Sequence, residues 1–71
     1  MPRFSRHARQ RMMERNISVA DVTAVLDNPD VTFRDPKGNP CSVREVDGRR
    51  IKVVASATDT DFVITAIDLD A

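Results

Sequence analysis

Three residues near the start of the chain, His7, Arg11 and Arg15, have the types and the spacing for phosphate chemistry. On a helix, residues four apart advance by about 40° around the axis, so these three would form one ridge. Guanidinium groups bind phosphate oxygens through paired hydrogen bonds, and imidazole is the side chain that titrates unperturbed near neutral pH. The pattern predicts a phosphodiester site in which His7 and Arg11 are catalytic and Arg15 binds the nucleic acid. The alternative is a structural helix, with His7 hydrogen-bonded to a neighbouring group beside the core.

A second basic group, Arg49, Arg50 and Lys52, follows the Asp47-Gly48 pair. In an alternating strand Arg50 and Lys52 share one face. If that face adjoins the first ridge, both side chains would bind nucleic acid in the same groove. If it faces solvent, their stems would instead cover aliphatic surface. The sequence leaves these two placements open.

Other catalytic templates are excluded by the residue counts. One His, one Cys and two Gly allow no two-histidine metal site, no cysteine-rich zinc site, no disulfide framework and no glycine-rich phosphate loop. We therefore predict no metal and no cofactor, and we expect Cys41 to be buried as a small apolar residue. No apolar run approaches the roughly 20 residues of a membrane span, and the start lacks the apolar stretch of a signal peptide. These features predict a cytoplasmic protein without a membrane partner.

The composition predicts one domain over residues 1–71, with a single aliphatic core. The chain is 41% hydrophobic and 31% charged, and it has three Phe but no Trp or Tyr. So few aromatic residues exclude a base-stacking surface of the type used by single-strand binders. The net charge is zero, yet residues 1–17 carry five Arg against Glu14, whereas residues 53–71 carry four Asp and no cation. A basic end can still attract phosphates, because salt screens distant charges beyond roughly 8 Å.

The ridge is expected to lie on a helix over residues 6–15. Ser5 is a suitable N-cap, and Phe4, Ala8 and Met12 recur at intervals of four as its core side. Asn16 can take the left-handed conformation that ends such a helix.

A second helix is predicted over residues 19–27. Ser18 caps it with Asp21 three residues later, and the Asn28-Pro29 pair ends it. The expected buried stripe consists of Val19, Val22 and Leu26, with Val25 at its edge.

Four strands are expected after Pro29, where the apolar pattern changes from helical to alternating. The predicted strands cover residues 31–34, 41–46, 50–57 and 62–69, and Asp47-Gly48 is a strong signal for a two-residue type I′ turn. Short connections favour antiparallel neighbours. The sequence thus predicts an α+β fold of order ααββββ, with an N-terminal αα-hairpin packed on a four-stranded antiparallel meander.

The last predicted strand is apolar on both sides. The two sets are Val63, Thr65, Ile67 and Leu69 on one face and Phe62, Ile64 and Ala66 on the other. The helices can cover only one face of the sheet. A second copy or another protein could cover the other, or a small sheet could simply leave a few aliphatic groups exposed.

Several segments resemble a small bacterial family known only as a domain of unknown function. They are the helix His7-Ala8-Arg9-Gln10-Arg11-Met12-Met13-Glu14-Arg15, similar to an H-A-x-x-R-M-x-x-R box, the Asn28-Pro29 break and the strand over residues 48–54. The arrangement also resembles the RelE and BrnT group of ribonuclease toxins, which place helices on an antiparallel sheet and are neutralised by an antitoxin. That resemblance implies metal-independent RNA cleavage, in which a base activates the 2′-hydroxyl, cations stabilise the phosphorane and an acid protonates the leaving oxygen.

The sequence also departs from that toxin group. It predicts no strand ahead of the first helix, it has no tyrosine, and residues 66–71 are acidic where the toxins tend to be basic. Two functions therefore remain as hypotheses. The first is a toxin-like ribonuclease or RNA-binding component of a toxin–antitoxin system, with RNA and an antitoxin as partners. The second is a noncatalytic interaction module whose uncovered sheet face binds a second copy or another chain.

Overall fold

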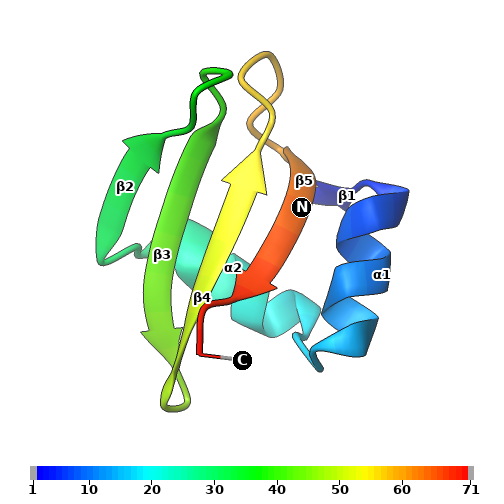
Figure 1. Ribbon diagram of the computed structural model, residues 1–71, viewed down its shortest axis with the longest axis vertical. Coiled ribbons are helices and arrows are strands. Elements are labelled where there is room, and N and C mark those ends of the chain that lie inside the picture. Colours follow the sequence, from blue (N-terminus) through cyan, green and yellow to red (C-terminus); the bar gives the residue numbers. More distant parts are fainter. Residues whose placement is uncertain (1, 71) are drawn as a thin grey trace.

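The computed structural model describes residues 2–70, in which two helices pack on a five-stranded sheet (Figure 1). In chain order the elements are β1 (Arg3–Phe4), α1 (Arg6–Glu14), α2 (Val19–Asp27), β2 (Val31–Arg34), β3 (Pro40–Val46), β4 (Arg49–Ala55) and β5 (Phe62–Asp68). The strands lie in the order β1-β5-β4-β3-β2. The predicted α+β class and the helix pair are confirmed, but the purely antiparallel four-stranded sheet is wrong, because β1 pairs parallel with β5.

β1 is the strand that the sequence did not predict. Arg3 lies opposite Phe62 and Phe4 opposite Val63, and the Ser5 N–H donates to the Val63 carbonyl over 3.0 Å. Two residues are too short to show an alternating pattern, so only their pairing with β5 defines them as a strand. The argument from short connections fails here because β1 and β5 come from opposite ends of the chain, with the rest of the domain as their crossover.

α1 begins and ends on the signals that the sequence carries. The Ser5 hydroxyl oxygen accepts the Ala8 N–H at 2.9 Å, and the same hydroxyl donates to the Ile64 carbonyl of β5 at 2.6 Å. At the other end Asn16 has a φ of 53°, the left-handed conformation expected for it. Ala8 and Met12 are buried, and Phe4 packs against the same core from β1. Ser5 thus both caps α1 and fastens it to the sheet.

Replacing Ser5 by alanine is expected to lower the free energy of unfolding by about 1–2 kcal/mol, because the helix loses its N-cap and a β5 carbonyl loses its donor. Urea unfolding followed by far-UV circular dichroism measures this loss. Ser5→Thr keeps the hydroxyl group and serves as the control, which should lose much less. Equal losses in the two variants would contradict the role assigned to the hydroxyl.

α2 has the predicted bounds and the predicted cap. The Ser18 hydroxyl accepts the Asp21 N–H at 3.0 Å, and the Asp21 carboxylate accepts the Ser18 N–H at 3.0 Å, which completes a capping box. The buried stripe differs from the prediction, because Val22 and Val25 are fully buried whereas Val19 is exposed. With the stripe centred between Val22 and Val25, Val19 falls at its margin.

A β-bulge changes which residues of β5 face the helices. Val54 pairs with Thr65 and Ala55 with Val63, so Ile64 has no partner on β4. Val63 and Ala66 therefore both join the core, and the predicted strict alternation along this strand is wrong. Thr65 and Ile67 lie on the opposite face, which no described helix covers (Figure 1). A bulge inserts one residue without changing the composition, so the apolar pattern of β5 did not reveal it.

The β3–β4 hairpin follows its sequence signal. Asp47 has a φ of 51° and Gly48 a φ of 85°, as a type I′ turn requires, and Val46 pairs with Arg49 across it. Cys41, opposite Val54, is fully buried, as expected. Both helices contain nine residues, and neither is long and apolar enough to cross a membrane.

Candidate nucleic-acid interface

The structure brings His7, Arg11 and Arg15 together along one groove of about 340 Å³. All three side chains project from the exposed flank of α1 beside its buried Ala8–Met12 stripe. The opposite wall consists of residues 65–68 of β5. The four-residue spacing therefore places a continuous basic ridge along one edge of the sheet.

The edge of β5 supplies main-chain donors to this groove. β1 pairs only with Phe62 and Val63, so within residues 2–70 no strand covers the outer edge of β5 beyond them. The Leu69 N–H donates to the Arg50 carbonyl of the neighbouring chain segment at 2.9 Å. Because donors alternate sides in an antiparallel pair, the N–H groups of Ala66 and Asp68 point away from β4 and toward the groove. Backbone N–H groups beside cationic side chains are suited to an anion.

His7 is exposed, and no other described residue hydrogen-bonds to its imidazole ring. The structural alternative, with the ring tied to a neighbouring carbonyl beside the core, is therefore not observed. Arg11 lies 3.5 Å from Glu14 in an exposed ion pair, which is weak and can rearrange when an anion binds. Both groups are available to a ligand that enters the groove.

Arg50 and Lys52 do not line the groove. They alternate with the buried Ile51 and Val53, which places them on the uncovered face of the sheet. The Lys52 ammonium lies 5.4 Å from the centre of the Phe33 ring, and Arg50 pairs with Asp70 at 3.5 Å. Lys52 is one strand away from the groove, since it lies opposite Ile67. Of the two placements that the sequence left open, the structure shows the solvent face.

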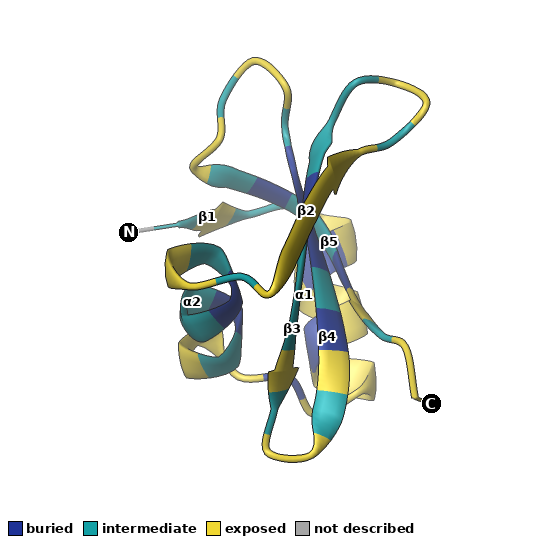
Figure 2. Cartoon of the chain, turned by 90° about the vertical axis from the view of Figure 1, so that its left-hand side faces the viewer, coloured by how far each residue is buried: buried dark blue, intermediate teal, exposed yellow. Residues whose placement is uncertain are grey.

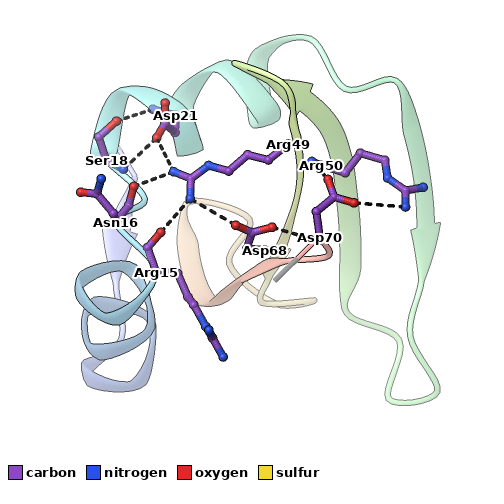
Figure 3. A network of polar contacts seen from close by, with 8 residues as sticks. All are labelled: Arg15, Asn16, Ser18, Asp21, Arg49, Arg50, Asp68 and Asp70. Carbon is purple, nitrogen blue, oxygen red and sulfur yellow. Dashed lines mark hydrogen bonds and ion pairs between the residues drawn. The ribbon is translucent and has the colours of Figure 1, made fainter.

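Arg49 is the cation of that group that reaches the helices, and no role was predicted for it from the sequence. Its guanidinium group donates to the Arg15 carbonyl at 2.7 Å and to the Asn16 carbonyl at 2.5 Å. It also pairs with Asp68 at 3.2 Å and with Asp21 at 3.5 Å (Figure 3). Arg49 thus caps the end of α1 and joins it to α2 and to β5, which fixes the groove's two walls. One signal in the sequence could have indicated this role. Arg49 directly follows the Asp47-Gly48 turn, so it must pair with Val46, and this pairing defines the sheet face of its side chain.

The segregated charges of the sequence meet in space. Arg3 at the basic end forms an ion pair and hydrogen bond with Asp59, which lowers the pKa of that carboxyl group below its usual value. Asp68 pairs with Arg49 and Asp70 with Arg50. The acidic end is therefore largely neutralised by local partners, and Asp68, although it lines the groove, is held by a cation.

A larger hollow of about 520 Å³ lies between α2 and the loops at the other end of the sheet. Its charged lining residues within the described chain are Asp27 and Asp61, without a cation. This hollow is unsuited to a phosphate, so we assign the candidate site to the smaller, basic groove. Among residues 2–70 no cluster of His, Cys, Asp or Glu could hold a metal ion.

The fold and the groove define a small α+β domain with a basic groove along one sheet edge. The chain belongs to the family described as Domain of unknown function (DUF4258), whose model matches residues 4–68. This match spans every helix and strand from Phe4 of β1 to the end of β5, and it confirms the family membership expected from the sequence. Neither the search of curated proteins nor that of solved structures gave a match.

Proposed function

We propose that this protein binds RNA through the groove formed by His7, Arg11, Arg15 and the edge of β5, as a toxin-like component of a toxin–antitoxin system. The observation that carries the proposal is the convergence of the three side chains in one groove, beside residues 65–68 of β5. Phosphate oxygens can accept hydrogen bonds from both guanidinium groups and from the backbone of β5. The ion pair to Arg49 reduces the repulsion that Asp68 would exert on a phosphate.

The geometry favours RNA binding over an enclosed catalytic centre. Arg50 and Lys52 lie on another face, so the groove has cations on one wall only. Cleavage needs both a base for the 2′-hydroxyl and an acid for the leaving oxygen. His7 is suited to one of these roles, and Asp68 is already held by Arg49. Metal-independent cleavage would therefore depend on His7. We include RNA cleavage as a second, more specific part of the proposal.

Fluorescence polarisation of a labelled single-stranded RNA tests the binding. Arg11→Ala and Arg15→Ala are each expected to weaken binding roughly 3- to 10-fold, the loss of one charged hydrogen-bonding group. Each should also reduce the slope of log affinity against log salt by about 0.7, the value for one lost single-strand phosphate contact. Arg9→Ala is the matched control. This substitution removes the same charge from the same helix, but Arg9 does not line the groove.

An equal effect of Arg9→Ala and Arg11→Ala would show only nonspecific attraction and would contradict the groove. Absence of RNA binding at low salt would overturn the proposal.

A second experiment tests RNA cleavage. RNA is incubated with the protein and a chelator, and the products are analysed for 2′,3′-cyclic phosphate ends. Cleavage that His7→Ala abolishes would support a ribonuclease, whereas binding without cleavage would restrict the function to RNA binding. Growth arrest on expression, relieved by His7→Ala or Arg11→Ala, would support the toxin.

The alternative of a noncatalytic interaction module is favoured by one observation, the apolar groups left on the uncovered sheet face. Val31, Phe33 and Ile67 are exposed there. Ile67 also lines the groove, so a partner chain that covers this residue would lie directly beside the RNA site.

A further inference from the structure

The edge strand β2 has an uncovered backbone at the side of the sheet opposite the groove. Every residue of β2 is exposed, and Figure 2 views the molecule from this side with β2 at the front. β2 is the last strand in the sheet order and pairs only with β3 among the described strands. Its outer donors and acceptors therefore face solvent, which is a template for another strand.

The register of β2 identifies which backbone groups point outward. The Asp35 N–H donates to the Asn39 carbonyl at 3.0 Å, in line with the pairing of Phe33 with Cys41. By the alternation of an antiparallel ladder, Val31 and Phe33 direct their N–H and C=O groups toward β3. Thr32 and Arg34 direct theirs away from the sheet, whereas the Asp30 N–H, just before the strand, donates to the Val43 carbonyl of β3 at 2.9 Å. Thr32 is thus the outward-bonding residue nearest the middle of the strand.

We infer that β2 pairs antiparallel with β2 of a second copy of this chain, about a twofold axis through Thr32. In this register each Thr32 donates its N–H to the carbonyl of the other Thr32, as a hydrogen-bonded antiparallel pair requires. Arg34 of each copy lies opposite Asp30 of the other. The two sheets then form one continuous sheet, with the two RNA grooves at its far ends. This inference is independent of the RNA proposal.

In this register the β2 side chains of one copy are complementary to those of the other. Val31 of one copy lies opposite Phe33 of the other, on the uncovered face. These side chains are 55% and 44% exposed in the single chain, and the dimer would bury them against each other. Arg34 and Asp30 already have partners in their own chain, since Arg34 donates to the Gly38 carbonyl at 2.7 Å and the Asp30 carboxylate accepts the Glu45 N–H at 3.2 Å. Both remain exposed, so their opposite charges add only a weak attraction at each end of the paired segment. A shift by one residue would place the apolar groups on opposite faces and lose both kinds of contact.

The edge of β2 is protected only in part, by the shortness of the strand and by the charge of Arg34. Val31-Thr32-Phe33-Arg34 contains no Lys, no Pro and no bulge in its pairing with β3. Pro29 and Pro36 flank the strand and limit the length that can pair. Such an edge favours a short, defined pairing of two copies over an extended aggregate.

Sedimentation equilibrium tests the dimer. The wild-type mass is expected to rise from 7.9 kDa toward twice that value as concentration increases. Thr32→Pro removes the outward N–H without breaking a bond to β3, and it should weaken the dimer at least about tenfold, as expected for two lost hydrogen bonds. Thr32→Val keeps the N–H and is the matched control, which should dimerise like the wild type.

A cysteine cross-link tests the register without relying on proline. Two Thr32 residues in this pairing have Cα atoms about 5.5 Å apart, within the range of a disulfide. Two Arg34 residues would lie about 14 Å apart, too far to join. Mild oxidation should therefore link Thr32→Cys into a covalent dimer but leave Arg34→Cys largely unlinked, since the native Cys41 is fully buried.

Three results would overturn the inference. The first is a wild-type protein that remains monomeric at about 1 mM, a concentration that detects even weak pairs. The second is a folded Thr32→Pro variant that dimerises as strongly as Thr32→Val, which would assign the dimer to another surface. The third is equal cross-linking of Thr32→Cys and Arg34→Cys, which would exclude the twofold register.

Discussion

Arg49→Ala is expected to lower the free energy of unfolding by about 2–4 kcal/mol. The guanidinium group makes charged hydrogen bonds to the carbonyls of Arg15 and Asn16, and it pairs with Asp68 and Asp21. The Arg49 side chain is 26% exposed and that of Asp68 only 12%, so the variant leaves a mostly buried carboxylate and two carbonyls without their donor. Partial solvent access keeps the expected loss below that of a fully buried pair.

Urea unfolding followed by circular dichroism measures this effect, since the chain has no Trp or Tyr for fluorescence. Arg50→Ala is the matched control on the next residue. Its side chain is 60% exposed, and its one ion-pair partner among residues 2–70 is Asp70, so the expected change is within about 0.5 kcal/mol. Arg49→Lys should fall between the two, because one ammonium group cannot reproduce the planar fork of donors. Equal losses for Arg49→Ala and Arg50→Ala would contradict the bridging role of Arg49.

Arg49→Ala is also expected to change the electrostatics of the groove. The variant frees Asp68, which lines the groove, so an unpaired carboxylate would face an entering phosphate. In protein that is still folded, RNA affinity should therefore fall although Arg49 itself is not among the groove residues. Unchanged affinity in the folded variant would show that Asp68 does not influence the site.

Ile51→Ala is expected to have the largest effect on the fold, a loss of about 3–4 kcal/mol. Ile51 is 0% exposed on β4 and belongs to the cluster that joins both helices to the sheet. Truncation removes buried methyl and methylene groups and leaves a cavity. A domain of this length has a total stability of roughly 4–10 kcal/mol, so the variant would retain little of it.

Ile67→Ala provides the comparison within the same residue type. Ile67 lies on the neighbouring strand but on the uncovered face, and it is 37% exposed. The expected loss is below about 1 kcal/mol, because most surface truncations have small effects. Urea denaturation of both variants measures the two losses of unfolding free energy. Similar losses would mean that the uncovered face is buried in solution, which would point to an interface there.

The local structure of the helices could be predicted from the sequence because short-range interactions determine it. Ser5 and Ser18 each cap a helix by accepting the N–H of the residue three positions later. Asn16, Asp47 and Gly48 adopt positive φ values, as their residue types favour at a helix end and in a type I′ turn. The bounds of α2 and the ridge of His7, Arg11 and Arg15 follow from the same local rules. The sequence also carried enough of the family's pattern for its membership to be expected.

The tertiary structure alone decided how distant segments meet. β1 exists because two residues at the start of the chain pair with β5 near its end, and the bulge at Ile64 exists because β4 and β5 pair in a shifted register. Arg49, Arg50 and Lys52 are neighbours in sequence, yet Arg49 reaches the helices while the other two face away from them. Local signals such as Asp47-Gly48 predict pairing within a hairpin, but pairing between segments far apart in the chain depends on contacts that local spacing does not encode. For that reason the sequence determined the basic ridge, and only the fold decided what stands opposite it.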